Sequence, residues 1–215
     1  MSAREIGLFP LAAVLVPGEL MPLHIFEERY KDLVADCRER GAEFALLYAD
    51  SEGARELGTT AEVVEVVETF EDGRMNIVIR GGQVVRVVEL TRGRSYMTGN
   101  VEAAEDDLAA GEEAVSALDL YRKIAAATGQ EPDPAVGGNE GGPLSYAIAA
   151  RVDFPAAEKQ RILERRAEKD RLMMIVELLS RGLENLATAA LIQARAKTNG
   201  KVAPPEETPE PEADA

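Results

Sequence analysis

The sequence predicts an α+β protein in which a small β barrel or strongly bent sheet is followed by a helical lobe. Runs rich in valine and isoleucine, separated by turns that contain glycine, fill the chain up to about residue 104. Beyond that point Ala, Leu, Glu and Arg recur at helical spacing, and strands followed by helices are typical of the α+β class. We therefore expect a β domain over residues 1–104, a helical lobe over residues 105–197 and a disordered, acidic, proline-rich tail over residues 198–215.

The β domain is expected to begin with a strand over residues 6–16, which Pro17 and Gly18 would end in a turn. An amphipathic helix is expected over residues 26–38, because its apolar positions recur at steps of three and four. Gly41 would cap this helix at its C-terminus. The helix is inserted early among the strands, so we expect it to cover part of the barrel.

Further strands follow the inserted helix. Residues 44–48 predict a short buried strand, and residues 59–70 predict the longest strand of the chain. The sequence EDGR at 71–74 then indicates a hairpin, because Asp-Gly between apolar runs favours a tight turn. After the return strand, Gly81-Gly82 is expected to turn the chain again, and the last strands are placed at 84–90 and 96–103.

The helical lobe is expected to begin near Glu112. A loop over residues 130–143, a short helix from Leu144 to about Val152, and a last helix that starts near Pro155 would complete it. Apolar residues of the last helix recur at steps of four and three, which predicts a seam that needs a partner helix. This partner is either the helix over residues 112–128 or a second copy of the chain. The oligomerisation residues of the second case are Leu172, Val176, Leu179 and Leu183.

Composition excludes several classes of protein. The 24 Lys and Arg residues face 39 Asp and Glu residues, a net charge of −15 that argues against binding the phosphate backbone of a nucleic acid. The nearest basic candidates would be Arg80, Arg86, Arg92 and Arg94. With one cysteine and one histidine, we expect no intrachain disulfide, no metal site and no cofactor. No apolar run reaches membrane-spanning length, and we expect a cytoplasmic protein that does not bind membranes.

The residues that carry most enzyme chemistry do not combine into a catalytic group. His24 has apolar neighbours and fits a structural histidine at a helix start better than a general base. Cys37 lies on the apolar side of the predicted helix, which indicates a small buried side chain. Glu62, Glu65 and Glu68 fit a solvated sheet face better than a pair of catalytic acids. We therefore expect no catalytic residue.

One segment carries more apolar side chains than a loop normally does. Residues 15–23 contain two prolines and a glycine, yet five aliphatic or methionine side chains. Either this segment folds inward and plugs the barrel, or it leaves an exposed apolar patch that accommodates varied partners. For the second case the peptide- or partner-binding residues are Leu15, Pro17, Leu20, Met21, Pro22, Leu23 and Phe26.

Several motifs resemble a known family. The residues LFPL at 8–11, VPG at 16–18 and PLHIFEERY at 22–30 are similar to the opening signature of the Lon protease N-terminal, substrate-binding domain. Later blocks of that domain resemble Gly58-Thr59, DGRMNI at 72–77, LSYAIA at 144–149 and EKQRILE at 158–164. The resemblance covers about residues 5–186, in order and nearly without gaps.

The resemblance implies a PUA-like β pseudo-barrel with an inserted helix, followed by a C-terminal helical lobe. In full-length Lon proteases this domain precedes an ATPase module and a Ser–Lys peptidase module. This sequence contains no Gly-x-x-x-x-Gly-Lys-Ser/Thr motif, so it resembles the stand-alone members of the family. Such members keep the recognition domain without the motor or the protease.

The leading hypothesis is a non-catalytic binding module that recognises apolar segments of unfolded proteins or a dedicated protein partner. One alternative is a structural or assembly protein that forms a homodimer through its C-terminal helix. A second alternative is a small-molecule binder with a pocket at the barrel mouth. The sequence does not choose between these ligands.

Overall fold

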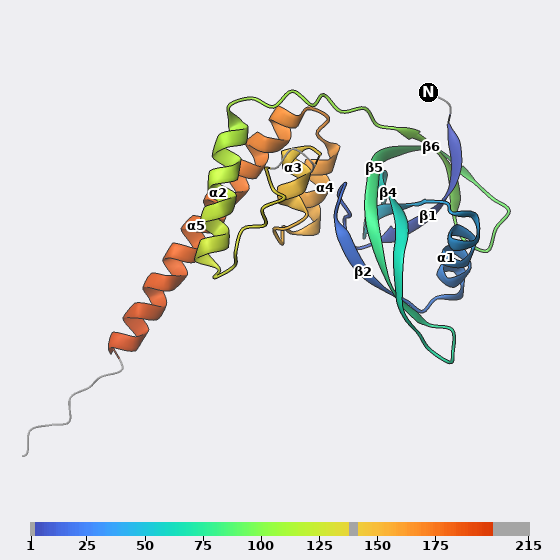
Figure 1. The fold of residues 1–215 in the computed structure, drawn as a ribbon, viewed down its shortest axis with the longest axis horizontal. Helices are drawn as coiled ribbons and strands as arrows, with labels where there is room; N and C mark the ends of the chain where they lie inside the picture. Colours follow the sequence, from blue (N-terminus) through green and yellow to red (C-terminus); the bar gives the residue numbers. More distant parts are fainter. Residues whose placement is uncertain (1–2, 138–141, 200–215) are drawn as a thin grey trace, which may run out of the picture.

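The computed structural model describes residues 3–137 and 142–199. These residues form a β barrel beside a lobe of helices, and the connection from β6 to α2 crosses from one to the other (Figure 1). The predicted α+β class and the order of barrel before helices are confirmed. The predicted tail lies outside the described residues except for its first two, which belong to the last helix.

Six strands form one sheet. They are β1 (Arg4–Leu11), β2 (Leu20–Ile25), β3 (Phe44–Asp50), β4 (Gly53–Thr69), β5 (Met75–Thr91) and β6 (Thr98–Ala103). Their order is β2-β5-β4-β3-β1-β6, and β6 also pairs with β5, which closes the barrel. Only the β1–β3 pair is parallel among these strands. Because residues 75–80 of β5 pair with β2 and residues 85–91 pair with β6, β2 is an extra strand at the edge of the closed part.

The inserted helix α1 (Glu28–Arg40) packs its apolar face into the barrel core. Figure 1 places it on the side of the barrel away from the helical lobe. Its predicted cap is confirmed, since Gly41 has a left-handed φ of 59° and the Ala42 N–H donates to the Cys37 carbonyl oxygen. The predicted hairpin is also confirmed, because the Phe70 N–H donates to the Arg74 carbonyl oxygen at 2.8 Å across the turn.

Three strand predictions are corrected. The first strand ends at Leu11 and does not reach residue 16, and β2 lies where a loop was expected. No turn occurs at Gly81-Gly82, where β5 continues through a register shift against β4. Gly81 is required there for close approach of two backbones, because a Cβ atom would lie 2.2 Å from the Val16 carbonyl oxygen.

The helical lobe contains α2 (Glu113–Ala127), α3 (Leu144–Ala149), α4 (Ala156–Glu164) and α5 (Glu168–Asn199). The single last helix predicted from Pro155 is corrected, since two helices occupy that stretch. Residues 165–167 separate the two helices. Within this segment Ala167 pairs with Asp107, which lies after β6, and the Glu168 N–H donates to the Asp107 carbonyl oxygen at 2.8 Å. This pairing anchors the segment after β6 to the start of α5.

A buried charge network lies at the same junction. Arg171 is completely buried and donates to the carboxylates of Glu168 (2.8 Å) and Asp106 (2.9 Å) and to the Arg165 carbonyl oxygen (2.9 Å). The second Glu168 oxygen accepts the Ser145 N–H at 2.9 Å. Because a buried charge is tolerated only when it is paired and hydrogen-bonded, these contacts hold α3, α5 and the barrel connection together.

The helical lobe and one part of the barrel share a hydrophobic cluster, beside two further clusters within the barrel. Val14, Val16, Leu57 and Val84 of the barrel belong to the same buried cluster as the apolar residues of the helices. An ion pair of 2.7 Å between the Lys159 ammonium and the Glu19 carboxylate closes the contact, with both side chains nearly buried. The strands end at Ala103 and the helices begin at Glu113, and the shared cluster contains residues from both sides of the boundary predicted at residues 104 and 105.

Candidate binding surface

The first part of the predicted apolar segment is buried. Leu15 is 1% exposed within the barrel core, and its carbonyl oxygen accepts the Thr59 hydroxyl at 2.6 Å. The Val16 N–H donates to the Glu19 carboxylate at 3.0 Å. Leu15 is therefore corrected from a binding residue to a core residue, and Pro17 is half-buried beside it.

The second part of the segment forms β2, whose side chains alternate between two faces. Met21 and Leu23 pack partly against the barrel core, while Leu20 and Pro22 point outward. Leu20 is 58% exposed, and Phe26, just after the strand, is 60% exposed. Thus the segment both fills the barrel and leaves apolar groups outside. We call Leu20, Pro22, His24 and Phe26 the outer face of β2.

The neighbouring strand β4 carries the sequence EVVEVVE at residues 62–68, whose period of three does not match the period of two of a strand. The structure resolves the mismatch with register shifts between Val63 and Glu65 and again between Val66 and Glu68. The extra residue in each bulge changes the side of the sheet to which the following side chains point. As a result all three glutamates point outward, whereas Val63 and Val66 pack toward the core.

The register aligns these residues in three cross-strand rows on one surface, because paired residues of antiparallel strands point to the same side. The first row contains Leu20, Arg80 and Glu62. The second row contains Pro22, Val78 and Glu65. The third row contains His24, Asn76 and Glu68. Apolar groups of β2 therefore lie on one side of β5 and carboxylates of β4 on the other.

The third row ends in an aromatic cluster. The rings of Phe26 and Phe70 lie about 6 Å from the His24 ring. Nδ1 of His24 is 2.7 Å from the Asn76 amide oxygen, and the Asn76 amide nitrogen donates to the Glu68 carboxylate at 3.1 Å. These contacts fix the imidazole between two aromatic rings. They extend the apolar surface toward the β4–β5 hairpin and give His24 a structural role.

The predicted dimerisation seam of α5 packs within the chain. Leu172 and Leu179 are buried against the helical core, and α5 runs beside α2. Val176 is half-buried and also contacts this cluster. The helix expected over residues 112–128, which is α2, thus packs against the seam, and this is one of the two partners that the sequence left open. Dimerisation through this seam stays a prediction, which now depends on Val176 and Leu183 alone.

Comparison with known protein families decides the relationship of the chain. Residues 5–181 match the family model of the ATP-dependent protease La (LON) substrate-binding domain. The chain belongs to this family. The resemblance of its sequence motifs to the Lon N-terminal domain is confirmed.

Related proteins support the assignment to the Lon substrate-binding domain. Lon protease 2 of Myxococcus xanthus is 31% identical over 212 residues, which cover 90% of this chain and 26% of that protein. The Lon protease of Anaeromyxobacter dehalogenans is 30% identical, with 86% of this chain and 24% of that protein covered. The chain therefore spans about a quarter of the length of these relatives.

Solved structures show the same fold. The crystal structure of a Lon N-terminal domain protein from Xanthomonas campestris has a TM-score of 0.61 and 24% identity. It covers 81% of this chain and 98% of that chain. The N-terminal domain of the Mycobacterium avium complex Lon protease has a TM-score of 0.62 and 13% identity, with 82% and 98% covered. The Lon N-terminal fold of this chain is thereby confirmed.

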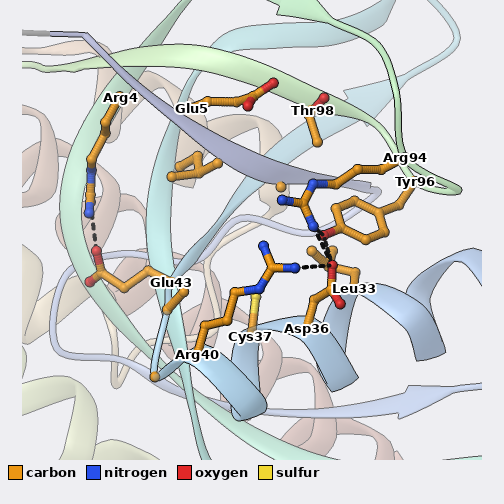
Figure 2. A pocket seen from close by; sticks show the side chains of 14 residues that line it. Arg4, Glu5, Leu33, Asp36, Cys37, Arg40, Glu43, Arg94, Tyr96 and Thr98 are labelled. Carbon is orange, nitrogen blue, oxygen red and sulfur yellow. Dashed lines mark hydrogen bonds and ion pairs between the residues drawn. The ribbon is translucent and has the colours of Figure 1, made fainter.

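A cavity of this Lon domain lies between α1, the start of β1 and the segment before β6. It has a volume of about 390 Å³, and Cys37 and Leu33 are among the residues that line it. Figure 2 shows Arg94, Arg40 and the Tyr96 ring directed at the Asp36 carboxylate. The Tyr96 hydroxyl donates to this carboxylate at 2.5 Å.

The charged groups of this cavity stabilise one another. The hydrogen bond from Tyr96 lowers the pKa of Asp36, while burial raises the pKa of Tyr96 to about 12. On the opposite wall, Arg4 pairs with Glu43 at 2.6 Å. A ligand would have to displace these internal partners. The geometry therefore favours a tether between α1 and the barrel over a small-molecule site.

The arginines considered for nucleic acid are mostly paired with carboxylates. Arg80 contacts Glu62 and Arg86 contacts Glu56, each at 3.2 Å. Arg94 contacts Asp36. No helix within the described ranges is long and apolar enough to cross a membrane.

Some residues of this surface were not singled out from the sequence. Val78 and Asn76 alternate with Ile77 and Ile79 along the strand after the hairpin, but β2 was not expected as a partner of that strand. Once the hairpin fixes the β4–β5 register, the same alternation places both residues between β2 and the glutamates. Phe70 belongs to the same surface and follows from the hairpin as well.

Proposed function

We propose that this Lon substrate-binding domain is a non-catalytic module that binds apolar segments of unfolded proteins, or a protein partner, on the outer face of β2. The observation that carries the proposal is the exposure of Leu20 and Phe26 beside Pro22 on a paired strand. Burial of such groups gives affinity without fixed geometry, which suits ligands of varied sequence. A cytoplasmic location is part of the same proposal.

The size of the surface favours moderate affinity. A patch of roughly 400 Å² buried at about 25 cal/mol per Å² contributes on the order of 10 kcal/mol before the cost of association. Losses of translational, rotational and side-chain freedom cancel much of this gain. Binding in the micromolar range is therefore expected.

The chemistry of the candidate nucleophile and base supports a non-catalytic role. Burial raises the pKa of the Cys37 thiol to about 11, so the reactive thiolate is scarce at neutral pH. Nδ1 of His24 is engaged by Asn76. The family model that this chain matches describes a substrate-binding domain.

The test is a double variant of two exposed apolar groups of the outer face of β2, Leu20→Ser with Phe26→Ser. Binding of a fluorescent, permanently unfolded model protein is measured by anisotropy, and we expect affinity to fall at least about tenfold. Met21 and Leu23 are unsuitable for this test, because they pack partly against the barrel core.

The matched control is Val88→Ser with Leu90→Ser, which removes two exposed apolar groups from the other half of β5. This control should bind as the wild type does. Equal loss in both double variants would indicate general stickiness, and no loss in the first would refute the assignment to β2. Circular dichroism and thermal unfolding confirm that all variants are folded.

A further inference from the structure

The acidic row on β4 is not electrostatically uniform. Glu62 forms an ion pair with Arg80 at 3.2 Å, and Glu68 accepts the Asn76 amide at 3.1 Å. Between them Glu65 is exposed, and its carboxylate makes no hydrogen bond or ion pair with residues 3–137 and 142–199. Its nearest neighbour across the strand pair is the apolar Val78. The middle row therefore offers one uncompensated negative charge beside the apolar surface.

We propose that the protein segments bound on the outer face of β2 carry a lysine or arginine that pairs with Glu65. This inference rests on the proposed function and specifies its ligand. The segment would place its apolar side chains against Leu20, Pro22 and Phe26. Its cation would cross over Val78 to reach β4.

The spacing of the strands sets the geometry of such a ligand. Neighbouring strands lie about 4.8 Å apart, so β2 and β4, separated by β5, are about 10 Å apart. A lysine or arginine side chain spans much of this distance and rests its aliphatic stem on apolar surface. Val78 provides that surface. One basic residue adjacent to the apolar anchors is therefore sufficient.

Pro22 indicates that side chains, and not an added strand, dominate the recognition. It lies in the middle of β2, an edge strand that pairs only with β5. A proline has no N–H to donate, and prolines on edge strands hinder the addition of a further strand. The charge and apolarity of the bound side chains then determine which segments bind.

Charge also distinguishes the proposed ligand from other molecules that could occupy this surface. A second copy of the chain would bring a further charge of −15, and a nucleic acid would bring its phosphates, so both would be repelled. A cationic apolar segment is attracted. Once its apolar groups cover the surface, the pair with Glu65 is less screened than an ordinary surface pair.

The experiment compares three synthetic peptides with the same apolar core and with lysine, serine or glutamate flanks. Anisotropy is measured for the wild type and for Glu65→Gln. We expect the lysine peptide to bind about tenfold more tightly than the glutamate peptide, and Glu65→Gln to weaken the lysine peptide about three- to fivefold. The serine peptide should bind both proteins equally.

The matched control is Glu184→Gln on α5, which makes the same change in net charge in the helical lobe. Equal weakening by Glu184→Gln and Glu65→Gln would show that the preference for the lysine peptide comes from the net charge of the protein, and it would overturn the inference. Equal affinity for all three peptides would also overturn it. If these peptides still lose affinity in the Leu20→Ser and Phe26→Ser variant, the proposed function stands without this refinement. If no peptide binds the wild type, both are refuted.

Discussion

Two apolar stripes of this molecule have opposite positions despite similar regularity in the sequence. The α5 stripe repeats at helical spacing, so its members share one face, and α2 covers them at Leu172 and Leu179. The β2 segment is read at a period of two, so half of it packs inward and half remains outside at Leu20 and Phe26. The apolar stripe of α5 is thus buried by the helices packed against it, whereas β2 keeps one of its faces exposed.

The difference separates stability from binding. Substitutions in the α5 stripe and its buried supports should change the free energy of unfolding. Substitutions on the outer face of β2 should change affinity alone. Variants in both regions test this division.

The largest effect on stability is expected for Arg171→Met. Removal of the guanidinium leaves Glu168 buried without its cation, and loss of one partner of a buried pair costs about 3–5 kcal/mol of unfolding free energy. Urea denaturation measures this cost. Arg181→Met on the exposed side of the same helix is the control, with a change within about 0.5 kcal/mol. A loss below about 1 kcal/mol for Arg171→Met would contradict the role given to the network.

Leu179→Ala should destabilise the protein by about 2–4 kcal/mol, because a cavity is left in the helical core. Leu186→Ala, at a more exposed position of α5, should cost less than about 1 kcal/mol. Thermal denaturation at several protein concentrations completes the test. A midpoint that rises with concentration would indicate that a second copy shares the seam.

Alkaline pH should destabilise the protein, through Tyr146 in the helical core and Cys37 in the barrel core. Burial raises the pKa of Tyr146 to about 12 and that of Cys37 to about 11, so the folded state holds both protons more tightly than the unfolded state. This stabilisation is complete below about pH 9 and is lost as the pH rises to about 12. For Tyr146 the loss is on the order of 2 kcal/mol. The melting temperature should fall less steeply across this range in Tyr146→Phe, and equal slopes would contradict the prediction.

The smallest effect on stability is expected for Leu20→Ser and Phe26→Ser. Both side chains are more than half exposed, so the unfolding free energy should change by no more than about 0.5 kcal/mol for each. Urea denaturation of the single variants checks this. A cost above about 1.5 kcal/mol would show that the outer face of β2 supports the fold.

Local chemistry made several elements predictable. The Asp72-Gly73 hairpin and the Gly41 cap follow from backbone preferences that need no tertiary information. The spacing of the α5 stripe predicted a buried face, although it could not identify α2 as the partner. The order of barrel and helices followed from the change in composition near residue 104, and the resemblance to the Lon N-terminal domain agreed with it.

Other features depend on neighbours that are distant in the sequence. Pro22 and the scarcity of β-branched residues concealed β2, which forms because β5 offers an unpaired edge. Gly81 looked like a turn but serves close contact with Val16. Nothing in the sequence around Arg171 indicates burial, which depends on its partners Glu168 and the sequence-distant Asp106. The candidate site was therefore half predicted, with its apolar residues named and their facing undetermined.

The position of β1 has a consequence for how the chain folds during synthesis. This strand is synthesised before the other strands of its sheet, yet it lies in the sheet between β3 and β6. Its antiparallel partner β6 is made about ninety residues later, and sequence-distant pairings of this kind slow folding. Until β6 has emerged, the edge of β1 that pairs with β6 has no partner, and the nascent chain exposes this edge. A domain that we propose to bind unfolded segments thus itself passes through a partly unfolded state in which a strand edge is exposed.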